Sequence, residues 1–165
     1  WKVTAEDQKI EELIFMMRRV GLDLSLRLEQ ELRHGDLSGV QVYLMVYLLR
    51  HHRDGTYLTE ICKEVGVSKS TLSALLKKLR KSGYIRFEEN PEDIRRKKVL
   101  PTEKLMQEGA VFVEQARQME AQICGALDAE EKQEFWRLGR KILTRFSEMD
   151  CIRTHKMTEQ EVSVL

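Results

Sequence analysis

The chain has 165 residues, of which 42% are hydrophobic and 33% are charged. This length fits one ordinary domain with a buried core, and the apolar fraction excludes a disordered chain. The formal net charge is only +1, but residues 58–101 contain 11 Lys and Arg against 6 Asp and Glu, a net +5, which leaves −4 for the rest of the chain. Such segregation of charge indicates a segment that binds a polyanion.

The N-terminal third of the chain predicts two helices. From Ala5 to Arg33 a long apolar stripe recurs at helical spacing, at Ile10, Leu13, Ile14, Met17, Val20, Leu24 and Leu28. A helix this long needs a partner to cover its stripe. Ser38 is placed to cap a second helix through Leu49, whose nearly continuous apolar character predicts the central core helix.

Two short helices are expected after a polar turn. The first spans about Leu58 to Val65 and ends at Gly66, and Ser68 is placed to cap the second, which spans Lys69 to Ser82. Four leucines of the second helix share one face: Leu72, Leu75, Leu76 and Leu79. The opposite face and its flanks carry small and basic residues and no carboxylate: Ser70, Ser73, Ala74, Lys77, Lys78 and Lys81. The pattern predicts a helix that is held by its leucines and presents a polar face outward.

The segment after Gly83 predicts a β-hairpin. Tyr84 to Glu88 is rich in β-branched and aromatic residues, residues 89–93 form a turn, and Lys97 to Pro101 returns as a short strand. Four consecutive cations lie beside the tip: Arg95, Arg96, Lys97 and Lys98. Two short helices followed by a charged hairpin predict a winged helix-turn-helix, here within residues 38–101.

The C-terminal part predicts two further helices. The first starts at Thr102 and ends by Gly125, and Asp128 with Glu131 predicts the capping box of the last. The last helix bears large apolar side chains, among them Phe135, Trp136, Leu138, Ile142, Phe146 and Met149. The terminal helices therefore carry more apolar surface than a compact winged helix can cover, which predicts association of two copies.

We expect a mostly α fold with a small β-hairpin wing, as a single domain over residues 1–165. Residues 1–34 and 102–151 form its dimerisation helices, and residues 152–165 form a polar, frayed tail.

The exposed face of the second short helix fits the major groove of DNA, which is about 12 Å wide. Small side chains near its N-terminus allow close approach, and the helix dipole favours phosphate there. The residues predicted to contact the major groove are Ser68, Lys69, Ser70, Thr71, Ser73, Ala74, Lys77 and Lys78. Arg95, Arg96 and Lys97 are predicted at the minor groove or its flanking phosphates, and Asp93 is placed to orient Arg95.

A resemblance to the MarR family of bacterial transcriptional regulators is carried by residues 58–103, LTEICKEVGVSKSTLSALLKKLRKSGYIRFEENPEDIRRKKVLPTE. Its most specific part is the Asp93-x-Arg95 pair followed by the run Pro101-Thr102-Glu103-Lys104, and the flanking helices extend the likeness over about residues 10–151. Pro101 departs from the family's more usual Leu and suits the end of a strand.

The resemblance implies a homodimer in which the first and the last two helices of each subunit interlock. It implies binding to a pseudo-palindromic operator, repression of transcription, and a minor-groove contact by Arg95. It also implies a small aromatic effector between the dimer helices and the winged lobe. Residues that could line that space are Met16, Met17, Tyr43, Met45 and Tyr47. Ordinary core packing explains them more simply, so no effector site and no cofactor are assigned.

Other chemistries have weak signals. Adjacent His51 and His52 point about 100° apart on a helix and lack partners at metal-ligand spacing, so no metal is expected. The three cysteines, Cys62, Cys124 and Cys151, form no C-x-x-C pair, which favours reduced thiols in the cytoplasm. A cysteine-based redox regulator remains an alternative. The family's peroxide sensors, however, carry their reactive cysteine in the N-terminal helix, where this chain has none.

No catalytic motif predicts an enzyme. The longest apolar run, residues 40–49, is about half of the ~20 residues that a bilayer span needs, and no signal for export is recognised. The serious alternative from another class is a winged helix that binds protein, with its basic face simply solvated. Binding to duplex DNA that weakens steeply with salt distinguishes the two.

Overall fold

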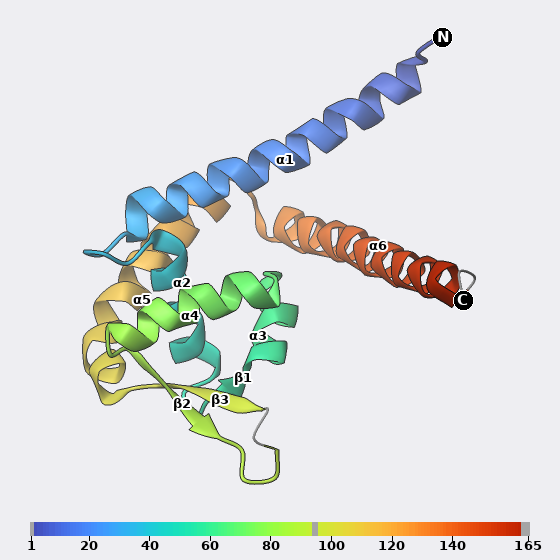
Figure 1. Ribbon diagram of the computed structural model, residues 1–165. Coiled ribbons are helices and arrows are strands. Elements are labelled where there is room, and N and C mark those ends of the chain that lie inside the picture. The colour runs from blue at the N-terminus through green and yellow to red at the C-terminus, as the bar shows by residue number, and fades with distance from the viewer. Residues whose placement is uncertain (1, 94–95, 163–165) are drawn as a thin grey trace. The chain divides into compact units, whose positions relative to one another are not determined.

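The computed structural model describes the backbone of residues 2–93 and 96–162, with side chains as far as Arg153. It divides into two compact units, Trp1–Met119 and Glu120–Leu165. In chain order the elements are α1 (Ala5–Leu32), α2 (Gly39–His51), β1 (Thr56–Tyr57), α3 (Leu58–Val65), α4 (Lys69–Lys81), β2 (Ile85–Glu89), β3 (Lys97–Pro101), α5 (Glu103–Cys124) and α6 (Ala129–Val162) (Figure 1).

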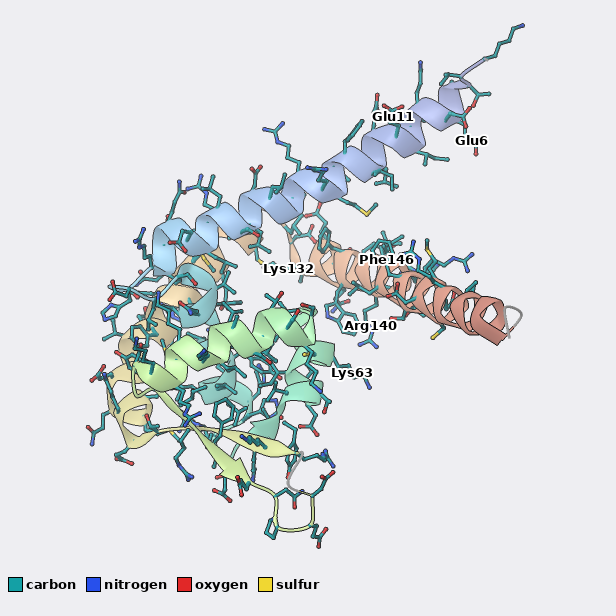
Figure 2. The ribbon with its side chains drawn as sticks, in the orientation of Figure 1. Glu6, Glu11, Lys63, Lys132, Arg140 and Phe146 are labelled. Atoms are coloured by element: carbon teal, nitrogen blue, oxygen red, sulfur yellow. The ribbon has the colours of Figure 1, made fainter. Side chains whose placement is uncertain are left out.

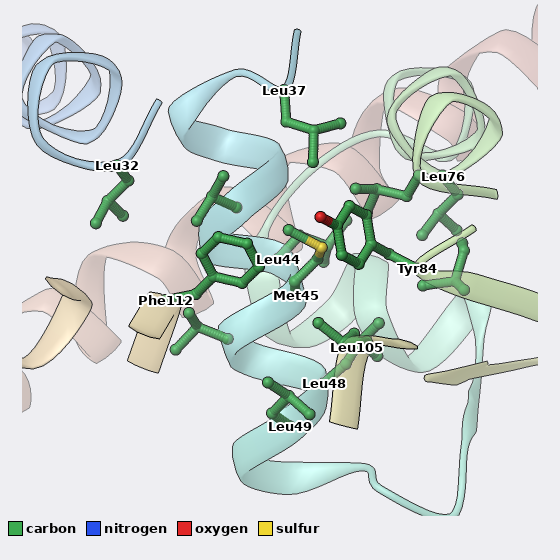
Figure 3. Packing of buried hydrophobic residues seen from close by; sticks show 14 of the residues in the cluster. Leu32, Leu37, Leu44, Met45, Leu48, Leu49, Leu76, Tyr84, Leu105 and Phe112 are labelled. Atoms are coloured by element: carbon green, nitrogen blue, oxygen red, sulfur yellow. The ribbon is translucent and has the colours of Figure 1, made fainter. Parts of the chain in front are cut away.

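Helix α2 is the centre of the core of the first unit. Its buried residues are Gly39, Gln41, Val42, Leu44, Met45, Val46, Leu48 and Leu49. Around it pack buried side chains from the rest of this unit, including Leu32 of α1, Leu76 of α4, Tyr84, and Leu105 and Phe112 of α5 (Figure 3). The prediction of a central core helix over residues 38–49 is therefore confirmed.

The crossing of α1 and α2 is unusually close. The amide of Gly39 donates to Oε2 of Glu29 at 2.7 Å, and a Cβ atom on Gly39 would lie 1.9 Å from the backbone oxygen of Leu28. That separation is far below van der Waals contact. Because the obstacle is a backbone atom, no change of side-chain rotamer removes the clash. The close packing of α1 on α2 therefore requires glycine at position 39.

The helix caps form at the residues that the sequence predicts. Ser38 and Gln41 form a capping box at the start of α2, and Asp128 and Glu131 form one at the start of α6 through two bonds of 2.8 Å. Gly66 ends α3 in the left-handed region, at φ 76°. These local signals placed the boundaries to within about two residues, which is the usual uncertainty of a helix end.

The sheet has one strand more than the predicted hairpin. Strand β1 pairs with β3 in antiparallel register, Thr56 opposite Val99, and the strand order is β1-β3-β2. A strand of two residues is too short for an alternating pattern, so only the tertiary pairing reveals it. Strand β2 pairs with β3 along its whole length, from Ile85 opposite Pro101 to Glu89 opposite Lys97.

The second unit contains the end of α5 and the long helix α6. Helix α6 continues to Val162, where a frayed tail from residue 152 was expected. The tail residues Lys, Met, Glu and Gln are good helix formers, and neither Gly nor Pro interrupts them. Figure 2 shows the side chains that project along this helix, Arg140 and Phe146 among them. No described helix combines the length and apolar character that crossing a membrane requires.

Candidate nucleic-acid interface

Helix α4 is held by one face and exposed on the other. Leu72, Leu76 and Leu79 are fully buried and Leu75 is half-buried, and the helix packs against α2, α3 and β2. Every α4 residue predicted to contact DNA is solvent-exposed: Ser68, Lys69, Ser70, Thr71, Ser73, Ala74, Lys77 and Lys78. The sequence therefore separated the buried from the exposed face of this helix correctly.

The first turn of α4 uses part of this set for its own cap. Oγ of Ser68 accepts from the amide of Thr71 at 3.2 Å and donates to Oγ1 of Thr71 at 2.8 Å. Ser70 lies 3.2 Å from the same oxygen. These bonds fix the N-terminus of α4, which leaves Ser73, Ala74, Lys77 and Lys78 as the predicted DNA contacts farther along the helix.

Lys78 has an acceptor within the protein. Its ammonium donates to the backbone carbonyl of Asp36, in the loop that precedes α2. This bond ties the last turn of α4 to the connection between α1 and α2. A charge that already has an acceptor gains less from a phosphate, so we expect Lys78 to position α4 more than to bind DNA.

We predict different results for two neighbouring lysines. Lys77→Gln should reduce the salt dependence of DNA binding, by about 0.9 in the slope of log K against log salt for each lost phosphate contact. Lys78→Gln should leave that slope nearly unchanged and lower the free energy of unfolding by about 1 kcal/mol. Salt titrations and urea unfolding of both variants measure this. If both variants changed the salt slope equally, Lys78 would contact DNA as Lys77 does.

The wing loop is closed by backbone hydrogen bonds. Asn90 N donates to Arg96 O at 3.2 Å, and Arg96 N donates to Asp93 O at 3.0 Å. The guanidinium carbon of Arg96 lies 4.4 Å from the ring centroid of Tyr57 on β1, a cation–π contact that orients this exposed side chain. Residues 94–95 lie outside the described part of the chain. The DNA contact of Arg95, and its orientation by Asp93, therefore stay predictions.

A hollow of about 300 Å³ lies between α4 and the wing. We call it the α4–wing hollow, and its lining residues are Leu58, Ser73, Leu76, Lys77, Arg80, Phe87 and Lys97. The guanidinium carbon of Arg80 lies 5.6 Å from the ring centroid of Phe87. Sequence reasoning missed Arg80, although Ser73, Lys77 and Arg80 recur at i, i+4 and i+7 and so share one helical face.

The arrangement of a helix-turn-helix, an exposed basic helix and a hairpin wing agrees with a family comparison. A sequence profile described as the MarR family matches residues 35–96. The matched residues contain the helix-turn-helix and most of the wing, and they are similar in sequence to the MarR family. MarR-family proteins are transcription regulators and not enzymes, which agrees with the class predicted from the sequence.

Solved MarR-family structures extend the likeness beyond the winged helix. The crystal structure of the S. aureus MepR–DNA complex has a TM-score of 0.69 at 23% identity and covers 80% of this chain and 96% of MepR. BpsR of Bordetella bronchiseptica has a TM-score of 0.63 at 19% identity, over 79% of this chain and 98% of BpsR. PcaV of Streptomyces coelicolor has a TM-score of 0.65 at 19% identity, over 78% of this chain and 89% of PcaV. No curated protein sequence matches the chain.

These similarities confirm the predicted fold: the chain has the fold of a MarR-family DNA-binding transcriptional regulator.

A polar cluster joins the core helix α2 to α3, the first helix of the helix-turn-helix. The hydroxyl of Tyr47 on α2 donates to Glu64 on α3 and lies 2.9 Å from Nε2 of His52. These bonds, that from Tyr47 first and that from His52 second, lower the pKa of the Glu64 carboxyl. Burial and the Glu64 carboxylate raise the pKa of Tyr47. The cluster fixes α3 against α2.

The other residues singled out in the sequence differ in their exposure. Met45 is fully buried in the core, whereas 54% of the Met16 surface is exposed. Cys62 packs half-buried against the core, and Cys124 and Cys151 are exposed. In the described part of the chain, no group of three or more His, Cys, Asp and Glu side chains is placed to hold a metal ion.

Proposed function

We propose that two copies of this chain bind a pseudo-palindromic DNA operator and repress transcription. The observation that carries this proposal is the exposed face of α4, which carries serines, Ala74 and Lys77, next to the cations of the wing. Helix α4 would enter the major groove, and Arg95, Arg96 and Lys97 would lie at the adjacent minor groove. An operator with two-fold symmetry requires a protein with the same symmetry, whose recognition helices are about 34–36 Å apart.

The apolar surface of the terminal helices supports the dimer. Large side chains of α1 are exposed to between 44% and 60%: Ile10, Leu13, Ile14, Phe15, Met16, Val20, Leu22, Leu24 and Leu26. On α6 Phe135, Trp136 and Leu143 are each exposed to 64%. A soluble monomer rarely leaves so much contiguous apolar surface in water. A second copy of the same helices would bury it through an interface in which both copies use the same surface.

We further propose that a small aromatic molecule releases the operator. The comparison structures include a BpsR whose DNA binding is regulated by 6-hydroxynicotinic acid and a PcaV in complex with its natural ligand. A ligand that binds better at one separation of the two recognition helices would shift the population of dimers toward that separation. The effector of this chain is to be found by screening aromatic acids for loss of operator binding.

The test of the proposed function begins with the operator itself. Duplexes that bind the purified full chain, selected from a random pool, should contain an inverted repeat with half-sites about 10 base pairs apart. Binding to the recovered sequence should weaken steeply as salt rises, in proportion to the phosphates neutralised. Salt-insensitive or absent binding to duplex DNA would instead favour a winged helix that binds protein.

Two substitutions test the division of work between the helix and the wing. Arg95→Ala should weaken operator binding strongly while the dimer persists. Ser73→Leu should reduce the preference for operator over random DNA more than it reduces nonspecific affinity. Binding to both duplexes is measured by fluorescence anisotropy. Wild-type affinity in either variant would refute the role assigned to that residue.

A further inference from the structure

We propose that the α4–wing hollow is a seat for one phosphate of the DNA backbone, held by Arg80 together with Lys77 and Lys97. The inference rests on the proposed function, since it needs a duplex lying against α4. It assigns to Arg80 a role in DNA binding that sequence reasoning did not give it, and to Phe87 the role of its support.

Three cations from two elements converge on this hollow. Lys77 and Arg80 come from α4, three residues apart on one face, and Lys97 comes from β3. Side chains alternate along a strand, so Lys97 shares a face of the wing with Val99, whose cross-strand partner is Phe87. The contact of Arg80 with Phe87 shows that this face is turned toward α4. The described side chains that line the hollow include three cations and no carboxylate.

Arg80 is orientated before any ligand arrives. Its guanidinium lies near the Phe87 ring, at 5.6 Å from the centroid, which limits the freedom of a long and exposed side chain. A planar guanidinium offers two parallel N–H donors to two oxygens of one phosphate, which a lysine ammonium does not. Less conformational entropy is then lost when the phosphate binds.

The surroundings favour a phosphate of the backbone over a base. Leu58, Leu76 and Phe87 provide an apolar wall, which reduces solvent screening of the cations around it. The hollow lies between the helix proposed for the major groove and the wing proposed for the minor groove. A DNA strand leading from one groove to the other must cross that gap, and what it presents there is its sugar–phosphate backbone. Ser73 on the rim adds a hydroxyl donor.

One carboxylate stands near this seat. Glu89 lies opposite Lys97 in the β ladder, and both line an adjoining hollow of about 330 Å³ together with Arg80 and Arg86. Arg86 is paired with Glu88 at 3.1 Å. A phosphate bound by Arg80 and Lys97 is therefore repelled by Glu89. The seat predicts that removing this charge strengthens DNA binding, a change opposite in sign to the loss of either cation.

The deciding experiment neutralises protein and DNA charges in combination. The selected operator is prepared with one methylphosphonate at a time along each half-site, and full-length wild type and Arg80→Gln are titrated against the set. For wild type, a methylphosphonate at one position per half-site, between the two groove contacts, should reduce the affinity about tenfold. For Arg80→Gln the same position should cost clearly less than in wild type, because the interaction with Arg80 is already lost and only those with Lys77 and Lys97 remain.

Matched variants complete the design. Arg80→Gln should reduce the salt slope by about 0.9 per half-site, whereas Arg80→Lys should keep the slope and recover only part of the affinity. Glu89→Gln should bind more tightly than wild type. Lys132→Gln, an equal charge change on α6, should bind as wild type does. Thermal unfolding of each variant identifies any loss that arises from misfolding.

The two proposals fail in different ways. Wild type that binds no operator overturns the proposed function, and the seat with it. Wild type that binds its operator while folded Arg80→Gln keeps the same affinity, salt slope and methylphosphonate profile overturns the seat alone.

Discussion

Replacing Gly39 by alanine is expected to destabilise the protein by about 3 kcal/mol, near the upper end of the usual cost of overpacking. The added Cβ atom would lie 1.9 Å from the backbone oxygen of Leu28, so α1 and α2 would have to move apart. That movement would also lengthen the 2.7 Å bond from the Gly39 amide to Glu29. Urea unfolding followed by circular dichroism, at one protein concentration for all variants, measures the change.

Gly21→Ala is the matched control for this prediction. Gly21 lies in α1, the helix against which Gly39 of α2 packs, and a Cβ atom on Gly21 would meet no heavy atom within 4 Å. Because alanine favours the helix over glycine, this variant should equal wild type or exceed it by up to about 1 kcal/mol. A Gly39→Ala protein as stable as wild type would show that the two helices do not cross this closely.

Replacing Phe146 by aspartate is expected to separate the proposed dimer and to weaken operator binding by about a hundredfold or more. Phe146 is 52% exposed on α6, where Figure 2 shows its ring projecting from the helix. A carboxylate buried in an apolar interface loses its hydration without gaining a partner. Two half-sites bound independently also lose the effective concentration that a dimer provides. Sedimentation velocity and operator titration measure both effects.

Gln133→Asp introduces the same carboxylate at a polar position of the same helix. Gln133 is exposed and lies in the second turn of α6. This control should sediment and bind DNA as wild type does. A Phe146→Asp protein that remains dimeric with full operator affinity would place the interface elsewhere, and a monomeric wild type at micromolar concentration would refute the dimer.

Local signals in the sequence predicted most of the elements. Ser38, Ser68 and the Asp128–Glu131 pair mark helix starts that depend on hydrogen bonds within a few residues. The leucine spacing of α4 gives its buried face, since that face follows from the 3.6-residue period alone. Strand β1 and the last turns of α6 were not predicted, because a two-residue strand has no period and a polar helix has no apolar stripe.

The sequence by itself determined the fold class, the exposed face of α4 and the basic character of residues 58–101. Only the tertiary structure decided what individual cations do. It places Lys78 on the Asp36 carbonyl, Arg96 on the Tyr57 ring and Arg80 beside Phe87. Each of these partners is more than five residues away in sequence, and the long flexible side chains reach them only after the chain has folded. Periodicity shows which face a residue occupies, and packing between distant segments decides which partner it meets.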